Sequence, residues 1–190
     1  MEKTYIEDKT FEQLDFTETG FTKADYENCS FTNCNFSNED LSKINFSDCS
    51  FNGCNLSLAK LGRTSFKDCK FIGCKLLGLH FDDCHEFLFS VSFENCQLNL
   101  STFYKRKVKK IIFKDCSLHE VDFTETDLTE AVFDNCDLNL STFSNTILDK
   151  ADLRTSYNYS IDPELNHIKK TKFSSAGIAG LLDKYDIEIE

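Results

Sequence analysis

The amino-acid sequence predicts an all-β solenoid, a four-sided coil in which the chain turns a corner every five residues. Two observations support this fold class: large apolar residues recur with a period of five, and small residues recur two positions before them. A helix would place apolar residues at intervals of about 3.6 and a strand at intervals of about 2.0, so a period of five fits neither element. It fits a chain that points two side chains of every five toward a shared axis.

The large residues form two uninterrupted runs. The first run is Phe11, Phe16, Phe21, Tyr26, Phe31, Phe36, Leu41, Phe46, Phe51, Leu56, Leu61, Phe66, Phe71, Leu76 and Phe81. The second is Leu88, Phe93, Leu98, Phe103, Val108, Phe113, Leu118, Phe123, Leu128, Phe133, Leu138, Phe143, Leu148 and Leu153. Because the second run is offset by two residues, we expect two inserted residues between Asp82 and Phe87, within a register break at about residues 82–90.

The cysteines indicate the length of one coil. All ten occupy the small place of the repeat, and Cys29, Cys49 and Cys69 follow one another at intervals of four repeats, which predicts four corners per coil. Stacked neighbours about 4.8 Å apart have parallel Cβ directions, which is poor geometry for a disulfide. A spacing of one repeat also differs from the tighter cysteine pairs of zinc sites. We therefore expect the cysteines to be reduced and packed in the core.

Composition and motifs argue against several classes of function. A net charge of −11 disfavours direct binding to nucleic acid or to anionic membranes. The sequence contains no Gly-rich phosphate loop, and its four histidines form no Ser-His-Asp or Cys-His pattern, so we expect no enzyme, cofactor, metal or small-molecule substrate. It also contains neither a long apolar run that could span a membrane nor a signal peptide, so we expect a cytoplasmic protein with no membrane association.

Several stretches match the consensus small–Asp/Asn–Leu/Phe–x–x, among them Cys34-Asn35-Phe36, Val121-Asp122-Phe123 and Ala151-Asp152-Leu153. In these stretches the sequence resembles the pentapeptide-repeat family, over roughly residues 9–158. The resemblance implies a right-handed quadrilateral β-helix in which each coil consists of four repeats. It leaves residues 1–8 as an N-terminal segment and residues 159–190 as a C-terminal tail.

The register break contains the sequence Asp-Asp-Cys-His-Glu-Phe-Leu-Phe-Ser, and inserted residues in a solenoid tend to bulge outward. Phe87 and Phe89 are then either exposed as a contact loop or packed beneath a small local bulge. Glu86 and Arg106 both fall on the small inward place, one coil apart. We expect them to form an inward ion pair, because an unpaired buried charge costs several kcal/mol. The alternative is that the coil kinks and both side chains reach the solvent.

The C-terminal tail predicts short helices and a dimer interface. Asp162-Pro163-Glu164 is typical of a helix start, a second helix is expected from about Ser174 to Asp183, and residues 185–189 alternate like an edge strand. This helical cap has more apolar surface than one end of a solenoid needs, which predicts a two-fold homodimer. The predicted interface residues are Leu165, Ile168, Phe173, Ile178, Leu181, Leu182, Ile187 and Ile189.

Charge is distributed unevenly along the chain. A basic belt, defined as Lys105, Arg106, Lys107, Lys109, Lys110 and Lys114, precedes a stretch rich in acids. Either these acids simply solvate the surface, or they form an anionic face for a basic partner. The predicted acidic face consists of Asp122, Glu125, Asp127, Glu130, Asp134 and Asp137.

Cys54-Asn55-Leu56-Ser57-Leu58, the break after Phe81 and the tail from Ile161-Asp162-Pro163-Glu164 to Asp186-Ile187-Glu188-Ile189 resemble one branch of the family. That branch is the topoisomerase-protecting proteins, namely Qnr, MfpA, McbG and AlbG. The resemblance implies an acidic, DNA-mimicking homodimer that binds DNA gyrase or topoisomerase IV and protects it from quinolone or peptide inhibitors. The basic belt is a departure from a simple duplex mimic. The alternative is a protein-interaction scaffold with no topoisomerase role.

Overall fold

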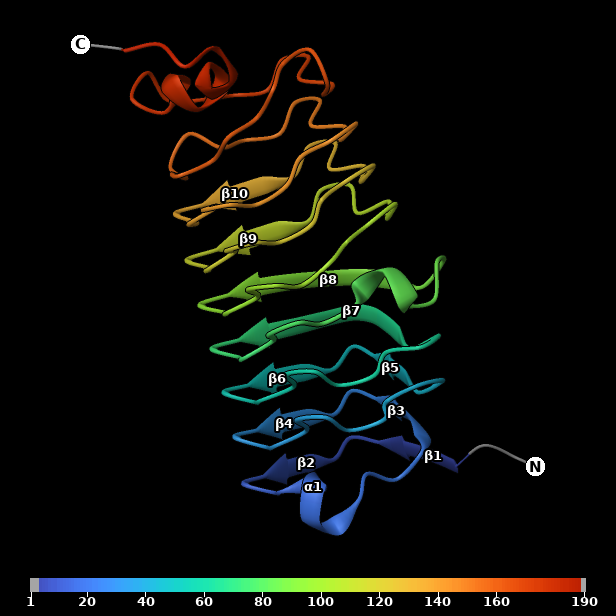
Figure 1. Cartoon of the computed structure of the whole chain (residues 1–190). Helices are drawn as coiled ribbons and strands as arrows, with labels where there is room; N and C mark the ends of the chain where they lie inside the picture. The colour runs from blue at the N-terminus through green and yellow to red at the C-terminus, as the bar shows by residue number, and fades with distance from the viewer. Residues whose placement is uncertain (1–3, 189–190) are drawn as a thin grey trace.

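The computed structural model, which describes residues 4–188, is a stack of parallel coils (Figure 1). Strands cover two of its sides. One side holds β1 (Thr4–Glu7), β3 (Ala24–Glu27) and β5 (Asn45–Ser47), and the other holds β2 (Thr10–Glu12), β4 (Ser30–Thr32), β6 (Ser50–Asn52), β9 (Ile112–Lys114) and β10 (Val132–Asp134). The longer strands β7 (Ser65–Ile72) and β8 (Phe89–Glu94) continue from the first side into the second. The predicted all-β solenoid is confirmed.

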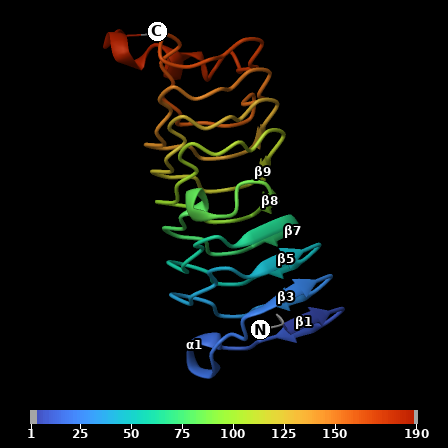
Figure 2. The same cartoon turned by 90° about the vertical axis from the view of Figure 1, so that its right-hand side faces the viewer.

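Strand register gives the coil length directly. Phe31 pairs with Phe51, four repeats further along the chain, and Phe93 pairs with Phe113 in the same way. Across the register break Phe71 pairs with Phe93, so this coil is two residues longer, as predicted. The two remaining sides are joined by isolated parallel bridges such as Asn35 to Asn55, and the coils stay stacked along the whole rod (Figure 2).

The axis of the coil is filled by the large residues of the repeat. Phe113 and Phe133 stack with ring centroids 5.1 Å apart, and rings on adjacent sides, such as Phe113 and Phe123, meet edge to face. The benzene quadrupole favours both arrangements. A planar ring also fits a spacing of about 4.8 Å between coils, which explains why Phe dominates this place.

The small place of the repeat packs against the backbone. All ten cysteines are free and buried, as the sequence predicts. The hydroxyl groups of Thr64, Thr126 and Thr146 lie at the same place, and each donates a 2.8 Å hydrogen bond to a backbone carbonyl of the preceding coil. Burial raises the pKa of the Cys49 thiol to about 12, so this thiol stays protonated at neutral pH.

The corners of the coil depend on backbone conformation. The residue two places after each large residue has a φ near +50° to +65° at most corners, the left-handed region that Gly, Asn and Asp tolerate best. Asn33, Gly53, Gly73, Asn95 and Asp115 follow this preference at successive corners of one column.

Both ends of the solenoid differ from the sequence-based expectation. The ladder begins at Thr4, which pairs with Ala24, and continues to Lys172, which bridges Asp152, so it extends beyond residues 9–158 on both sides. Near the N-terminus the short helix α1 (Phe16–Thr19), which we did not predict, lies at the open end of the first coil (Figure 1). Its sequence signal is Asp15, whose carboxylate accepts the Thr17 N–H, followed by Gly20 with a φ of 74° at the C-cap.

The C-terminal tail continues the coil instead of beginning a helix at Asp162. Asn166 is buried in the small place, where its amide donates to the Phe143 carbonyl and accepts the Thr146 N–H. Ile168 and Phe173 pack against the core, one coil after Leu148 and Leu153. The period of the repeat therefore outweighs the local helix-start signal. Two 3-10 helices follow, η2 (Ile178–Leu181) and η3 (Asp183–Tyr185); residues 186–188 form no strand, and Ile189 lies outside the described residues.

Candidate interaction surfaces

The register break folds as a compact bulge. The 3-10 helix η1 (Phe81–Asp83) begins it, and pairing shifts from Phe66–Phe89 to Cys69–Val91 within β7 and β8. We predicted that Leu88 would resume the inward series, and this is wrong: Leu88 is 44% exposed. Phe89 takes the inward place opposite Phe66, 23 residues earlier in the chain, and the separation shortens to 22 residues from the Cys69–Val91 pair onward.

Arg106 stabilises the bulge from inside. Its side chain is buried, and Nη1 and Nη2 donate hydrogen bonds of 2.9 Å and 3.1 Å to the carbonyls of Cys84 and His85. The guanidinium also lies 4.8 Å from the centre of the Phe89 ring, within cation–π range. Burial lowers the pKa of Arg106, but a guanidinium remains charged at neutral pH.

The predicted inward ion pair between Glu86 and Arg106 is wrong. Glu86 is exposed on the bulge, and the described salt bridges include none between these two residues. The physical reason is that the bulge carries Glu86 away from the axis, while the carbonyl groups it turns inward satisfy the guanidinium. A buried charge thus finds neutral acceptors instead of a carboxylate, which avoids desolvating a second charge.

The two bulge phenylalanines lie differently. Phe87 is 84% exposed, while Phe89 is partly buried and meets the Phe81 ring edge to face at 5.9 Å. Of the two alternatives that the sequence leaves open, exposure therefore holds for Phe87 and packing beneath the bulge holds for Phe89. Phe87 is the side chain through which this loop can contact another molecule.

The predicted acidic face is partly offset by the basic belt. The ion pairs are Lys105–Glu125 at 3.6 Å, Lys109–Asp127 at 3.3 Å, Lys110–Glu130 at 3.6 Å and Lys150–Glu130 at 3.1 Å. Lys105 and Lys110 each precede their partners by one coil, so these pairs join adjacent coils. The hydrogen bond from Lys150 and the charge of Lys110 hold the pKa of Glu130 below its ordinary value.

The other three acids of this face have no Lys or Arg partner among the described salt bridges. Asp122 accepts the Thr124 N–H at 2.8 Å, and Asp134 accepts the Thr155 hydroxyl at 2.9 Å. Asp137 lies 2.7 Å from His119, which is charged only when protonated. The six acids thus divide into three that are paired with lysines and three that are partly exposed and have no lysine partner.

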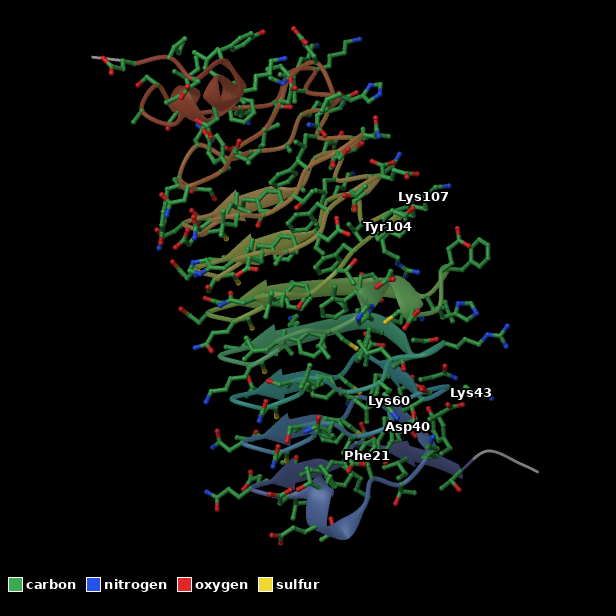
Figure 3. The ribbon with its side chains drawn as sticks, viewed as in Figure 1. Phe21, Asp40, Lys43, Lys60, Tyr104 and Lys107 are labelled. Atoms are coloured by element: carbon green, nitrogen blue, oxygen red, sulfur yellow. The ribbon has the colours of Figure 1, made fainter. Side chains whose placement is uncertain are left out.

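Cations also occur outside the belt. Figure 3 shows Lys43 and Lys60 near Asp40 on the right-hand side of the view, with Tyr104 and Lys107 further along that side, while Phe21 lies nearer the N-terminal end. Lys43, Lys60 and Lys107 appear in none of the described ion pairs. These columns carry both signs of charge, because Lys60 bridges Asp40 and Lys107 bridges Asp127 on neighbouring coils.

The predicted dimer residues are partly used within the chain. Leu165, Ile178 and Ile187 are each more than half exposed, whereas Ile168, Phe173 and Leu181 pack against the core, Leu182 is partly buried and Ile189 is not described. The 3-10 helices are tied to the last coil by Lys184, whose Nζ lies 2.8 Å from Asp162 and 2.7 Å from Glu164. Three apolar side chains thus remain available at this end.

This architecture defines a class of protein, the parallel β-solenoid, whose interior is filled and whose accessible side chains lie on the outer corners and at the ends. Among residues 4–188 we find no group of three or more His, Cys, Asp or Glu that could hold a metal ion. Nor does that part of the chain contain a helix long and apolar enough to cross a membrane.

Residues 24–85 and 87–158 match the family model described as pentapeptide repeat region. The chain therefore belongs to the pentapeptide-repeat family, and the match indicates no enzyme family. A search of curated proteins finds no match.

Solved structures share the fold. HetL from Nostoc sp. strain PCC 7120, described as involved in heterocyst differentiation regulation, has a TM-score of 0.68 at 15% identity, covering 90% of this chain and 87% of HetL. A trypsin-treated variant of QnrB1, described as a plasmid-mediated fluoroquinolone resistance protein, has a TM-score of 0.52 at 22% identity. That alignment covers 100% of this chain and 95% of the QnrB1 chain. At these identities the likeness shows the fold alone.

Proposed function

We propose that this protein is a non-catalytic cytoplasmic homodimer that binds DNA gyrase or topoisomerase IV and protects it from quinolone or peptide inhibitors. The observation that carries the proposal is the concentration of acids on the C-terminal coils: residues 115–152 contain ten Asp or Glu and Lys150 as their one Lys or Arg. A surface of this kind suits a basic groove that otherwise holds DNA. The fold shared with QnrB1 is compatible with such a partner.

The unpaired acids are the ones expected to act in binding. A carboxylate already paired with a lysine gains less from a cationic groove than one that has no cationic partner. We therefore assign partner contact to Asp122, Asp134 and Asp137, with the ion-paired Glu125, Asp127 and Glu130 contributing less. Phe87 is a further contact on a different coil.

The test is a gyrase supercoiling assay with ciprofloxacin or a peptide poison, together with a pull-down on the purified enzyme. Wild type is expected to bind at micromolar concentration and restore supercoiling. Asp122→Asn, Asp134→Asn and Asp137→Asn together remove charge but keep a side-chain acceptor, and we expect them to weaken binding at least tenfold. The matched control Asp8→Asn, Glu12→Gln and Glu18→Gln removes as many charges from the first coil and is expected to have little effect.

A second candidate function is a protein-interaction scaffold with no topoisomerase role. The ion pairs between the basic belt and Glu125, Asp127 and Glu130 favour it, because they reduce the negative field that duplex mimicry needs. Absence of both binding and rescue at micromolar protein would reject the topoisomerase proposal and leave this one.

A further inference from the structure

One corner column of the solenoid carries exposed leucines where the backbone disfavours them. Leu58, Leu100 and Leu140 have φ values of 59°, 63° and 57°, in the left-handed region, and their side chains are 60%, 62% and 71% exposed. For a residue other than Gly, Asn or Asp this conformation costs roughly 1–2 kcal/mol. The backbone conformation at these leucines therefore lowers the stability of the fold, and the burial of their side chains offsets little of that cost.

The three leucines stand in one line along the rod. The amide of Leu58 donates to the Leu77 carbonyl, next to Gly78, and that of Gly78 donates to the Asn99 carbonyl, next to Leu100. Leu100 and Glu120 continue the column through His119 and Asn139 toward Leu140. The column thus reads Leu58, Gly78, Leu100, Glu120, Leu140, with a leucine on alternate coils.

Gly78 leaves room for the leucine below it. A Cβ at Gly78 would lie 2.8 Å from Leu58 Cδ2, so the Leu58 side chain leans over this glycine. Glu120 is exposed between Leu100 and Leu140 and places one negative charge within the apolar line. The corner is therefore an apolar ridge, which we define as the leucine ridge (Leu58, Leu100 and Leu140).

The spacing of the leucine ridge identifies the shape of its partner. Two coils advance about 9.6 Å at about 4.8 Å each. Seven residues of an α-helix advance about 10.5 Å, whereas two residues of a strand advance about 6.7 Å. A helix with apolar residues at heptad spacing can thus place a hole between its side chains opposite each leucine, while a strand cannot stay in register.

We propose that the leucine ridge is a docking edge for an amphipathic α-helix from another protein, lying along the solenoid axis, with heptad-spaced apolar residues and a basic residue facing Glu120. Within residues 4–188 the longest helical element has four residues, so that part of the chain does not supply such a helix. The proposal is independent of the topoisomerase proposal.

The test uses a displayed library of helical peptides five turns long, with apolar residues fixed at heptad positions and the other positions randomised. A second library with alternating apolar residues is the control for peptide shape. We expect the intact protein to enrich peptides from the heptad library alone. Binders are expected to lose at least about 30-fold in affinity on Leu58→Asn, Leu100→Asn and Leu140→Asn together, as for the loss of several anchor residues.

Stability separates this role from a structural one. Asn tolerates the left-handed conformation better than Leu, so the triple variant should unfold at a denaturant concentration equal to or higher than that of wild type while binding is lost. The control variant Ile72→Thr, Ile112→Thr and Val132→Thr removes three exposed apolar residues from another side and should keep affinity within twofold. No enrichment, equal binding by the triple variant, or loss of self-association in that variant would each overturn the proposal.

Discussion

At the scale of single residues, Arg106 replaces the ladder contacts that the 82–90 bulge interrupts. We expect Arg106→Ala to lower the free energy of unfolding by about 2–3 kcal/mol, because it leaves the inward carbonyls of Cys84 and His85 without their donors. Arg106→Lys should recover only part of the loss, since one ammonium lacks the planar fork. Urea denaturation provides the measurement.

Glu86 supplies the control for this prediction. Because Glu86 is exposed, Glu86→Ala should change the unfolding free energy by less than about 0.5 kcal/mol, and the two substitutions should be additive. A large coupling energy between Glu86 and Arg106 would instead indicate an ion pair in solution and contradict this prediction.

The buried thiols predict a dependence of stability on alkaline pH. In the folded protein burial raises the pKa of Cys49 from 9.0 to about 12. The unfolded chain therefore loses this proton at a lower pH, so the stabilisation is complete below pH 9 and declines as the pH rises from 9 toward 12. We expect the melting temperature to fall across this window, and Cys49→Ala to make the fall less steep than in wild type.

At the scale of elements, truncating a ring in the middle of an aromatic ladder should lower the free energy of unfolding more than truncating one at its end. Phe113 is fully buried and stacks on Phe93 at 5.3 Å and on Phe133 at 5.1 Å. Phe113→Ala should cost about 3–5 kcal/mol, because it removes contacts with both neighbouring coils. Phe173→Ala, at the partly buried end of the same column, should cost clearly less. Equal losses in chemical denaturation would contradict a nearest-neighbour solenoid.

The elements also show what the sequence can and cannot predict. Period five predicts the coil and its core, because inward packing repeats at every corner and each coil rests on the last. The same period, followed from Leu148 to Ile168 and from Leu153 to Phe173, predicts the extra coil that we assigned to a helix from Asp162-Pro163-Glu164. Local capping signals at the tail are weaker than a continued ladder of backbone hydrogen bonds.

The candidate surfaces were less predictable, because they depend on how neighbouring coils meet. The insertion between Asp82 and Phe87 is visible in the sequence, but which of Leu88 and Phe89 points inward depends on the path of the bulge. The pairing of Lys105 with Glu125 follows from the four-repeat coil and was available from spacing alone. To recognise Leu58 as an exposed residue at a left-handed corner, both its backbone angle and its place in the column must be known, and the sequence alone gives neither.

At the scale of the whole molecule, the rod carries its charges in zones. The basic belt and the ion-paired Glu125, Asp127 and Glu130 occupy adjacent coils, so the net charge of −11 is not distributed uniformly. Exposed pairs are screened by salt over about 10 Å at an ionic strength of about 0.1 M. Affinity for a basic partner should therefore fall steeply with salt concentration if the acids without a lysine partner make the contact. Affinity of a helix for the leucine ridge should depend far less on salt concentration.

The proposed homodimer gives the last prediction. Leu165, Ile178 and Ile187 are exposed at the C-terminal end, and a two-fold contact there would join two rods tail to tail. Ile178→Asp together with Ile187→Asp should convert a dimer to a monomer in sedimentation equilibrium, because each carboxylate would be desolvated in the interface. Ile112→Thr, which alters an exposed residue on the strand face, should leave the dimer intact. A wild-type protein that sediments as a monomer at tens of micromolar, or a variant that remains dimeric, would show that these side chains do not hold two copies together.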